Sequence, residues 1–256
     1  MTISSRKNEN VRLVRELFRD KKLRGGEGKF AVEGDHLCGE LAKTGYDIAL
    51  FLCTEKSAEK YPETVAALKK SARGCAVITE ELSEYISDTK APQGLFAVAQ
   101  MPAQSAIPDS AKKLVVLDGV QDPGNVGTIV RTAEALGLDG AVLSESCADI
   151  YSPKTLRASM GSALRLPCIT GRLAEILPTL KQRGFELYGA LLDESARRLG
   201  AFSFAEKSAV VIGSEGAGVS EEVKALCGSA VYIPITGAES LNAAAAAAII
   251  LWELKK

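Results

Sequence analysis

The sequence of 256 residues is poor in histidine and has no long apolar run, and each shortage excludes a class of protein. Its one histidine, His36, excludes the two-histidine metalloprotease helix, the Cys/His zinc cluster and any acid–base site that needs two imidazoles. The longest run of low polarity, residues 243–252, is mostly alanine and reaches half of the roughly 20 residues that a membrane span needs. The sequence therefore predicts a chain with no metal site and no contact with a membrane.

The cysteines and the N-terminus indicate the compartment. Six cysteines are scattered along the chain without a CxxC pair, and a chain of this length can bury an adequate core without disulfides. The N-terminal residues are charged where a signal peptide would carry its apolar stretch. We therefore expect free thiols and a cytoplasmic protein. His36 falls on an amphipathic pattern, where a structural role is more common than a catalytic one.

Charge is balanced overall but not locally. The chain has 31 Lys and Arg against 32 Asp and Glu, so its total charge indicates no polyanionic partner. Residues 1–30 hold nine basic residues against four acidic ones, around a predicted helix from Asn8 to Arg24 that ends in a glycine-bearing loop, LRGGEGK. This excess favours contact with RNA phosphates, although a solvated helix face accounts for it equally well. The candidate RNA-binding residues are Arg6, Lys7, Arg12, Lys21, Lys22, Arg24 and Lys29.

Strand and helix patterns alternate in both halves of the chain. In the first half, short apolar runs such as IALFLCT are separated by predicted helices over 35–44, 55–72 and 80–87. A segment with two prolines follows, and the alternation restarts at KLVVL. This order predicts an α/β fold with a mostly parallel sheet in the second half and a smaller α/β domain in the first. We expect domains at residues 1–100 and 113–256, joined by a linker at 101–112.

Three loops of the second half have the composition of a ligand site. DGVQDPGNVG, GSEGAGVS and ITGAESLN each follow a predicted strand, are rich in glycine and small polar residues, and lead into a helix. The carboxyl ends of parallel strands meet at one edge of a sheet, where helix N-termini offer free N–H groups. Neither GxxxxGK[ST] nor GxGxxG is present, and Glu215 in the second loop would repel a pyrophosphate. A nucleoside with a cationic centre, such as S-adenosylmethionine, tolerates that carboxylate better.

These loops, in this order, resemble the three motifs of the SpoU/TrmH family of SPOUT RNA methyltransferases. The matching segments are NVGTIVRTA at 125–133, IGSEGAG at 212–218, and IPITG at 233–237 continuing through ESLN at 239–242. The stretch PKTLRASMGS at 153–162 is similar to the family's segment between the first two motifs. The resemblance covers residues 113–256 and is specific, because three motifs of this length agree in order. It implies a deep trefoil knot at the cofactor site and a homodimer through the C-terminal domain.

The resemblance also implies a reaction and a set of site residues. Methyl transfer from S-adenosylmethionine to a ribose 2′-hydroxyl needs no metal, but the hydroxyl must be held in line and must lose its proton. Arg131 matches the arginine that activates this hydroxyl; because arginine is almost never neutral, anchoring the adjacent phosphate is its alternative role. Asn125 would orient the substrate and cap its helix, and Glu215 would pair with Arg131 or orient the hydroxyl. The candidate catalytic residues are Asn125, Arg131, Glu215, Ser240 and Asn242, and the candidate cofactor-binding residues are Gly213, Ile233 and Leu241.

The N-terminal half is similar, less strongly, to the family's substrate-binding domain, which has a ribosomal-protein-like RNA-binding fold. We therefore predict an S-adenosylmethionine-dependent 2′-O-ribose methyltransferase that acts on structured RNA. Ribosomal RNA, 23S ribosomal RNA in particular, is favoured over transfer RNA because of this N-terminal domain. A transfer-RNA methyltransferase and a non-catalytic RNA-binding protein of the same fold are the alternatives. The missing glycine fingerprint disfavours a Rossmann-type oxidoreductase.

Overall fold

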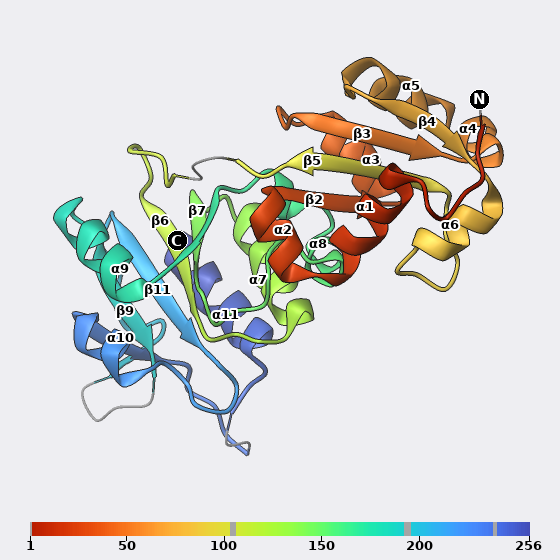
Figure 1. Ribbon diagram of the computed structural model, residues 1–256. Coiled ribbons are helices and arrows are strands. Elements are labelled where there is room, and N and C mark those ends of the chain that lie inside the picture. The colour runs from red at the N-terminus through yellow and green to blue at the C-terminus, as the bar shows by residue number, and fades with distance from the viewer. Residues whose placement is uncertain (1, 103–105, 192–195, 238–239) are drawn as a thin grey trace. The chain divides into compact units, whose positions relative to one another are not determined.

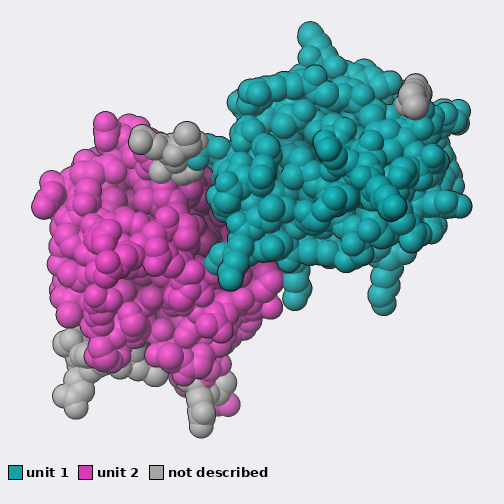
Figure 2. All heavy atoms as spheres, viewed as in Figure 1, with its two compact units in different colours: residues 1–104, 151–164 teal, residues 105–150, 165–256 magenta. Residues whose placement is uncertain are grey.

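The computed structural model describes residues 2–102, 106–191, 196–237 and 240–256 (Figure 1). The chain divides into two compact units, the first made of residues 1–104 and 151–164 and the second of residues 105–150 and 165–256 (Figure 2). A segment from the second half of the sequence therefore belongs to the first unit. The division at residues 1–100 and 113–256, which follows the sequence motifs, stays a prediction.

The first unit is built around a mixed sheet with the strand order β1-β4-β3-β5-β2. Strand β4 runs parallel to β1 and β3, while β5 runs antiparallel to β3 and β2. Its strands are β1 (Thr2–Ile3), β2 (Lys29–Glu33), β3 (Ile48–Cys53), β4 (Cys75–Ile78) and β5 (Leu95–Gln100). Its helices are α1 (Glu9–Arg19), α2 (Lys21–Glu27), α3 (Asp35–Ala42), α4 (Glu55–Lys60), α5 (Pro62–Ser71), α6 (Glu80–Ile86), α8 (Pro153–Ala158) and the 3-10 turn η1 (Ser162–Leu164).

Helix α1 is stabilised by an N-terminal cap and by an apolar stripe that is buried against the sheet. The Asn8 side chain accepts hydrogen bonds from the backbone N–H groups of Asn10 and Val11, which satisfies two donors of the first turn. The stripe packs with α6 against one face of the sheet, in a core that includes Leu52, Phe96 and Val98. The buried residues of α1 are Val11, Val14, Leu17 and Phe18.

Two predicted helices are each broken into two, and the predictions of single helices are wrong. Asp20 is extended, ends α1 and caps α2 with its side chain. Most of LRGGEGK is therefore helical, and α2 ends at Glu27 with Gly28, whose φ is 62°, as its C-cap. The helix expected over 55–72 is interrupted at Tyr61. Pro62 then begins α5, because a proline cannot donate the hydrogen bond that would continue α4.

Residues 151–164 join the first unit through aromatic and polar contacts. The ring of Tyr151 stacks on the fully buried Phe30 of β2, with the ring centroids 4.6 Å apart. His36 Nε2 of α3 lies 3.2 Å from the carbonyl oxygen of Met160, so the one histidine makes a structural contact. Arg157 forms an ion pair with Asp88 at 2.9 Å. These contacts explain why the segment does not group with its neighbours in sequence.

The second unit has a sheet of seven strands, with the order β10-β12-β9-β11-β6-β7-β8. All of its pairs in the described chain are parallel, which confirms the predicted parallel sheet. The trefoil knot stays a prediction. The strands are β6 (Lys113–Asp118), β7 (Gly140–Ser144), β8 (Cys168–Gly171), β9 (Glu186–Ala190), β10 (Arg197–Arg198), β11 (Ser208–Gly213) and β12 (Ser229–Tyr232). The helices are α7 (Pro123–Ala135), α9 (Leu173–Gln182), α10 (Glu221–Leu226) and α11 (Ala243–Lys255).

Helices cover both faces of this sheet (Figure 1). Leu114 and Val116 of β6 and Val211 of β11 pack against α9 and α10 in one core. The intervening residues of each strand point to the opposite face, because side chains alternate along a strand. There α11 packs on β11, β6 and α7. The carboxyl ends of the strands, which precede α7, α10 and α11, are thus fixed from two sides.

We expect Phe30→Ala to loosen residues 151–164 before the rest of the first unit. Loss of a fully buried phenylalanine ring destabilises a domain by about 3–5 kcal/mol, and here it also removes the surface on which Tyr151 stacks. Hydrogen exchange followed by mass spectrometry checks this, with faster exchange expected at 151–164 than at α9. Tyr46→Phe is the control, since it keeps the ring packed on Phe30 and removes only a hydroxyl. Unchanged protection of 151–164 in Phe30→Ala would contradict the assignment.

Candidate active site

Three polar loops leave the sheet of the second unit at its carboxyl edge. They are residues 119–122 after β6, 214–220 after β11 and 233–242 after β12, and they lead into α7, α10 and α11. Strands β6 and β11 are neighbours, and β9 alone separates β11 from β12. Because the strands are parallel, all three loops emerge on the same side. The structure thereby brings the three predicted motifs together.

The side chain of Asn125 joins the three loops. Its Nδ2 donates a hydrogen bond to Oε1 of Glu215 in the second loop. Its Oδ1 accepts one from Nδ2 of Asn242 at the end of the third loop, at 3.1 Å. The amide thus donates to a carboxylate and accepts from another amide at the same time. Three candidate catalytic residues, far apart in the sequence, form one network.

The helix caps around this network differ in part from the prediction. The cap of α7 is Asp122, whose Oδ1 accepts from the backbone N–H of Asn125 at 2.9 Å. Asn125 therefore lies in the first turn and does not cap α7, which leaves its side chain available for the network. Asn242 does cap α11, because its Oδ1 accepts from the N–H groups of Ala244 and Ala245 at 3.0 and 3.2 Å. Ser240 lies before the cap and is exposed.

The second loop is held by a close backbone approach at Gly213. A Cβ at this position would lie 2.0 Å from the carbonyl carbon of Gly218 and 2.2 Å from the backbone nitrogen of Val219, so only glycine fits. Ser214 and Gly218 exchange backbone hydrogen bonds of 3.1 and 2.9 Å, which closes the loop into a tight turn. Glu215 stands on this turn and is exposed.

Sequence reasoning missed two residues that shape the site. Asp118, the last residue of β6, is 8% exposed, and its Oδ2 accepts from the backbone N–H of Ser220 at 2.8 Å. It ties the start of α10 to the neighbouring strand. Ser144, at the end of β7, accepts from the N–H of Gly119 at 2.9 Å and lies 2.9 Å from Ser146. A polar residue at the carboxyl end of a buried strand is the signal that could have identified both.

The remaining candidates are not part of this network. Arg131 is exposed on α7, and no hydrogen bond or ion pair links it to Glu215 in the part of the chain that the structure describes. Ile233 and Leu241 are half-buried at the two ends of the third loop. Glu239, which belongs to the third motif, lies outside the described residues.

These residues fit a nucleoside with a cationic centre. The half-buried side chains of Ile233 and Leu241 offer apolar surface to a base. Glu215 offers a carboxylate to a positive charge, and Gly213 lets the second loop fold back against its own backbone beside that carboxylate. No group of three or more His, Cys, Asp or Glu side chains placed to hold a metal ion occurs among the described residues.

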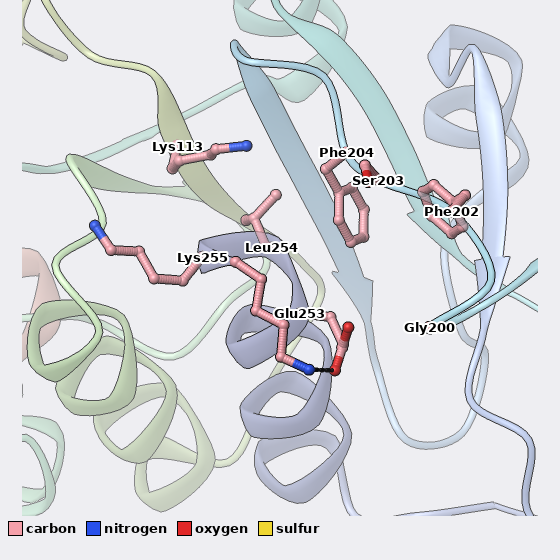
Figure 3. A pocket seen from close by; sticks show the side chains of 9 residues that line it. Lys113, Gly200, Phe202, Ser203, Phe204, Glu253, Leu254 and Lys255 are labelled. Carbon is pink, nitrogen blue, oxygen red and sulfur yellow. Dashed lines mark hydrogen bonds and ion pairs between the residues drawn. The ribbon is translucent and has the colours of Figure 1, made fainter.

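A cavity of about 440 Å³ lies near the amino end of β6 in the same sheet. None of its lining residues belongs to the network. Figure 3 shows Lys113, Phe202 and Phe204 beside the cavity, together with the last residues of α11. Lys113 begins β6, whereas the motif loops follow the carboxyl ends of the strands. Its Nζ donates to the carbonyl oxygen of Ala205 at 2.8 Å, and partial burial lowers the pKa of Lys113.

The basic candidates of the first unit are mostly on its surface. Lys29 is half-buried and forms an ion pair with Glu27 at 2.9 Å. Arg24 differs from the prediction, because it is only 4% exposed and its Nη1 donates to the carbonyl oxygen of Leu17 at 2.6 Å. Arg24 is therefore held inside the first unit and does not reach an RNA phosphate on the surface. The exposed candidates are Arg6, Lys7, Arg12, Lys21 and Lys22.

The structure also shows the protonation state of two cysteine thiols and whether a helix could cross a bilayer. All six cysteines are free, and burial raises the pKa of Cys168 to about 12 and that of Cys227 to about 11. These two thiols therefore stay protonated at neutral pH. In the described part of the chain, every helix is too short or too polar to cross a bilayer.

Comparisons with known proteins identify relatives of both halves. Residues 112–252 match the model of the SpoU rRNA Methylase family, and residues 8–97 match that of the MRM3-like substrate binding domain. The chain is 34% identical over 254 residues to the 23S rRNA (guanosine(2553)-2′-O)-methyltransferase RlmP of Bacillus subtilis, covering 99% of this chain and 98% of the relative.

Solved structures of similar proteins have the same fold. The SpoU methyltransferase AviRb from Streptomyces viridochromogenes, in complex with AdoMet, matches with a TM-score of 0.87 and 29% identity, over 97% of each chain. An AdoMet-bound rRNA methyltransferase from Sinorhizobium meliloti matches with a TM-score of 0.88 and 26% identity, over 100% of this chain and 97% of that one. These matches agree with the α/β fold and the parallel sheet described above.

We expect Gly213→Ala to distort the second loop and Gly216→Ala to leave it intact. The new methyl group at 213 would overlap the backbone of Gly218 and Val219, whereas nothing lies within 4 Å of a Cβ at 216. Binding of S-adenosylhomocysteine, measured by calorimetry, should fall at least about tenfold in Gly213→Ala and stay unchanged in Gly216→Ala. Equal affinities for the two variants would show that the loop does not shape the ligand site.

Proposed function

The chain belongs to the SpoU rRNA methylase family, and we propose that it transfers a methyl group from S-adenosylmethionine to a ribose 2′-hydroxyl of ribosomal RNA. The observation that carries the proposal is the Asn125–Glu215–Asn242 network, because it assembles candidate catalytic residues from three motif loops at one edge of the sheet. The Bacillus subtilis relative, by its name a 23S rRNA 2′-O-methyltransferase similar to this chain over nearly its whole length, supports 23S ribosomal RNA as the substrate.

The three loops would hold the cofactor. Gly213, Ile233 and Leu241 would contact the nucleoside through backbone groups and apolar packing, and Glu215 would lie near its charge. S-adenosylmethionine supplies an already activated methyl group, so no metal ion is required. Two structural relatives with AdoMet bound, the proteins from Streptomyces viridochromogenes and Sinorhizobium meliloti, support this assignment.

Arg131 would act on the RNA. Its exposed guanidinium can anchor the phosphate next to the target ribose by a forked hydrogen bond and stabilise negative charge that develops on the 2′-oxygen. Asn125 would orient the hydroxyl, and Glu215, which accepts a hydrogen bond from Asn125, fixes the orientation of that amide. Ser240 and Asn242 would contribute to the same site from the third loop. Positioning of the hydroxyl is the main demand, because the methyl donor is already reactive. The 2′-oxygen would bond to the methyl carbon as the carbon–sulfur bond breaks, S-adenosylhomocysteine would leave, and the hydroxyl proton would pass to water.

The first unit would bind the RNA. The family match of residues 8–97 to a substrate-binding domain supports this role, as does the exposed basic surface of α1 and α2. A transfer-RNA methyltransferase is the alternative that the family allows. A non-catalytic RNA-binding protein is less well supported, since binding alone does not require the intact network.

We also propose a homodimer, formed through α11, in the cytoplasm. Ala245, Ile249 and Trp252 recur at helical spacing on this helix, and Ile249 and Trp252 are 41% and 57% exposed. A stripe of large apolar side chains in water favours burial against a second copy. The trefoil knot at the cofactor loops belongs to the same proposal.

We expect purified protein to label undermodified 23S ribosomal RNA from radioactive S-adenosylmethionine. A 2′-O-methyl group blocks alkaline cleavage at its own 3′ phosphate, so the label should appear in alkali-resistant dinucleotides. Label in mononucleotides would indicate base methylation and contradict the ribose assignment. Label in a transfer-RNA pool alone would identify the alternative substrate.

We expect Arg131→Ala to lower kcat/KM by about 10²–10³-fold while leaving the affinity for S-adenosylhomocysteine unchanged. Arg131→Lys should fall between this variant and the unmodified protein, because lysine keeps the charge but lacks the planar fork. Arg172→Ala, which removes an exposed arginine beside α9 on the other face of the sheet, is the matched control. Full activity of Arg131→Ala in single-turnover assays would rule out both proposed roles.

We expect Trp252→Arg to convert the dimer to monomers, because the variant places a charge in the apolar stripe of α11. Light scattering coupled to size-exclusion chromatography measures the mass. Met160→Arg, which changes an apolar residue of the first unit that is 43% exposed, should leave the mass unchanged. A monomeric unmodified protein at micromolar concentration would contradict the dimer.

A further inference from the structure

Two arginines of the first unit converge on one tyrosine. The guanidinium carbon of Arg6 lies 4.7 Å from the centroid of the Tyr85 ring, and that of Arg15 lies 4.1 Å from it. Arg6 precedes α1, Arg15 is on α1 and Tyr85 is on α6. Both distances are within the roughly 6 Å at which a cation and an aromatic ring attract each other. The packing of α1 on α6 thus fixes two cations at one place on the surface.

These two charges are not neutralised by the described part of the chain. Neither arginine takes part in an ion pair there, although Glu81 and Glu84 are exposed on α6. The Nε atom of Arg15 is buried and has no hydrogen-bond partner among the described residues. Two like charges beside one ring repel each other, and a donor without a partner is costly. An anion that contacts the guanidinium groups beside this ring would offset their positive charge.

Further arginines extend this cluster along α1. Arg12, Arg15 and Arg19 are spaced by three and four residues, so they lie on one flank of the helix. Arg12 forms only an exposed ion pair with Glu16, at 3.8 Å, and Arg19 is exposed. A row of cations of this kind matches a charged backbone that passes along the helix.

We propose that Arg6 and Arg15, held by Tyr85, form a binding site for a backbone phosphate of the substrate RNA, an inference that rests on the proposed function. A guanidinium stacked on a ring can still donate from its edge to a phosphate, and on Arg15 the Nη atoms would do so because Nε is buried. Because the stacking already restricts the side chain, less conformational entropy is lost when the phosphate binds. Sequence reasoning selected Arg6 but neither Arg15, which lies beside the buried stripe of α1, nor Tyr85, which lies in an acidic helix.

The salt dependence of RNA binding tests this site. With an unmodified 23S ribosomal RNA transcript as the probe, Arg15→Gln and Arg6→Gln should each raise Kd about tenfold. The slope of log K against log salt should become shallower by about 0.7–0.9 for each lost phosphate contact. In methylation assays the KM for RNA should rise while kcat at saturating RNA and the affinity for S-adenosylhomocysteine stay unchanged.

Variants of Tyr85 separate preorganisation from charge. Tyr85→Leu keeps both cations but removes the ring, so Kd should rise roughly fivefold while the salt slope stays as in the unmodified protein. Tyr85→Phe keeps the ring and should bind RNA normally. Circular dichroism melting curves show whether each variant is folded. If Tyr85→Leu does not fold, the site is tested by the two arginine variants alone.

The matched control is Lys60→Gln. It also removes one cation from beside a tyrosine, since Lys60 Nζ lies 5.2 Å from the ring centroid of Tyr61, but it does so on α4 rather than on α1. Its affinity and salt slope should not change. The site would be overturned if the arginine variants bind RNA with the same Kd and the same salt slope as the unmodified protein. If these variants also still methylate RNA, the proposed function stays intact. If the unmodified protein neither binds nor methylates RNA, the proposed function and the site fail together.

Discussion

The amide of Asn125 is the constraint on which the geometry of the candidate site depends. The parallel sheet brings three loops to one edge, but strand pairing leaves the loops free to adopt several arrangements. Asn125 removes this freedom because it donates to Glu215 and accepts from Asn242 at once. An aspartate of the same shape could not donate, and a leucine could do neither. One side chain therefore links the three motif segments directly.

Packing and site geometry are coupled at the same residues. Asn242 uses its oxygen to cap α11 and its nitrogen to reach Asn125, so the start of a helix that covers β6 and β11 also completes the network. Asp118 and Gly213 act in a comparable way at the second loop, one by a buried hydrogen bond and the other by the absence of a side chain. Asp118, Gly213 and Asn242 thus position parts of the candidate site through contacts that also belong to the framework of the second unit.

The sequence could predict the convergence of the loops but not the contacts within it. Loop composition, strand alternation and three ordered motifs predict that the three loops meet at the carboxyl edge, and the structure brings them together there. Asp122 and Asn125 have similar capping propensities, and only the folded chain decides which one caps α7. Arg24 belongs to a basic run, and its burial depends on the carbonyl group of Leu17, which a charge count does not include. The stacking of Tyr151 on Phe30 is equally invisible to local patterns.

The division of the chain has a consequence for synthesis on the ribosome. The packing of Phe30 is complete only when Tyr151 stacks on it. In the sequence, the segment that carries Tyr151 comes after two strands and a helix of the second unit. A domain that is contiguous at the N-terminus can fold as soon as it leaves the exit tunnel. The first unit of this chain can pack Phe30 against Tyr151 only after residues 151–164 have emerged. We therefore expect its last packing step to follow the synthesis of β6, α7 and β7, so that the two units complete their folding in an interleaved order.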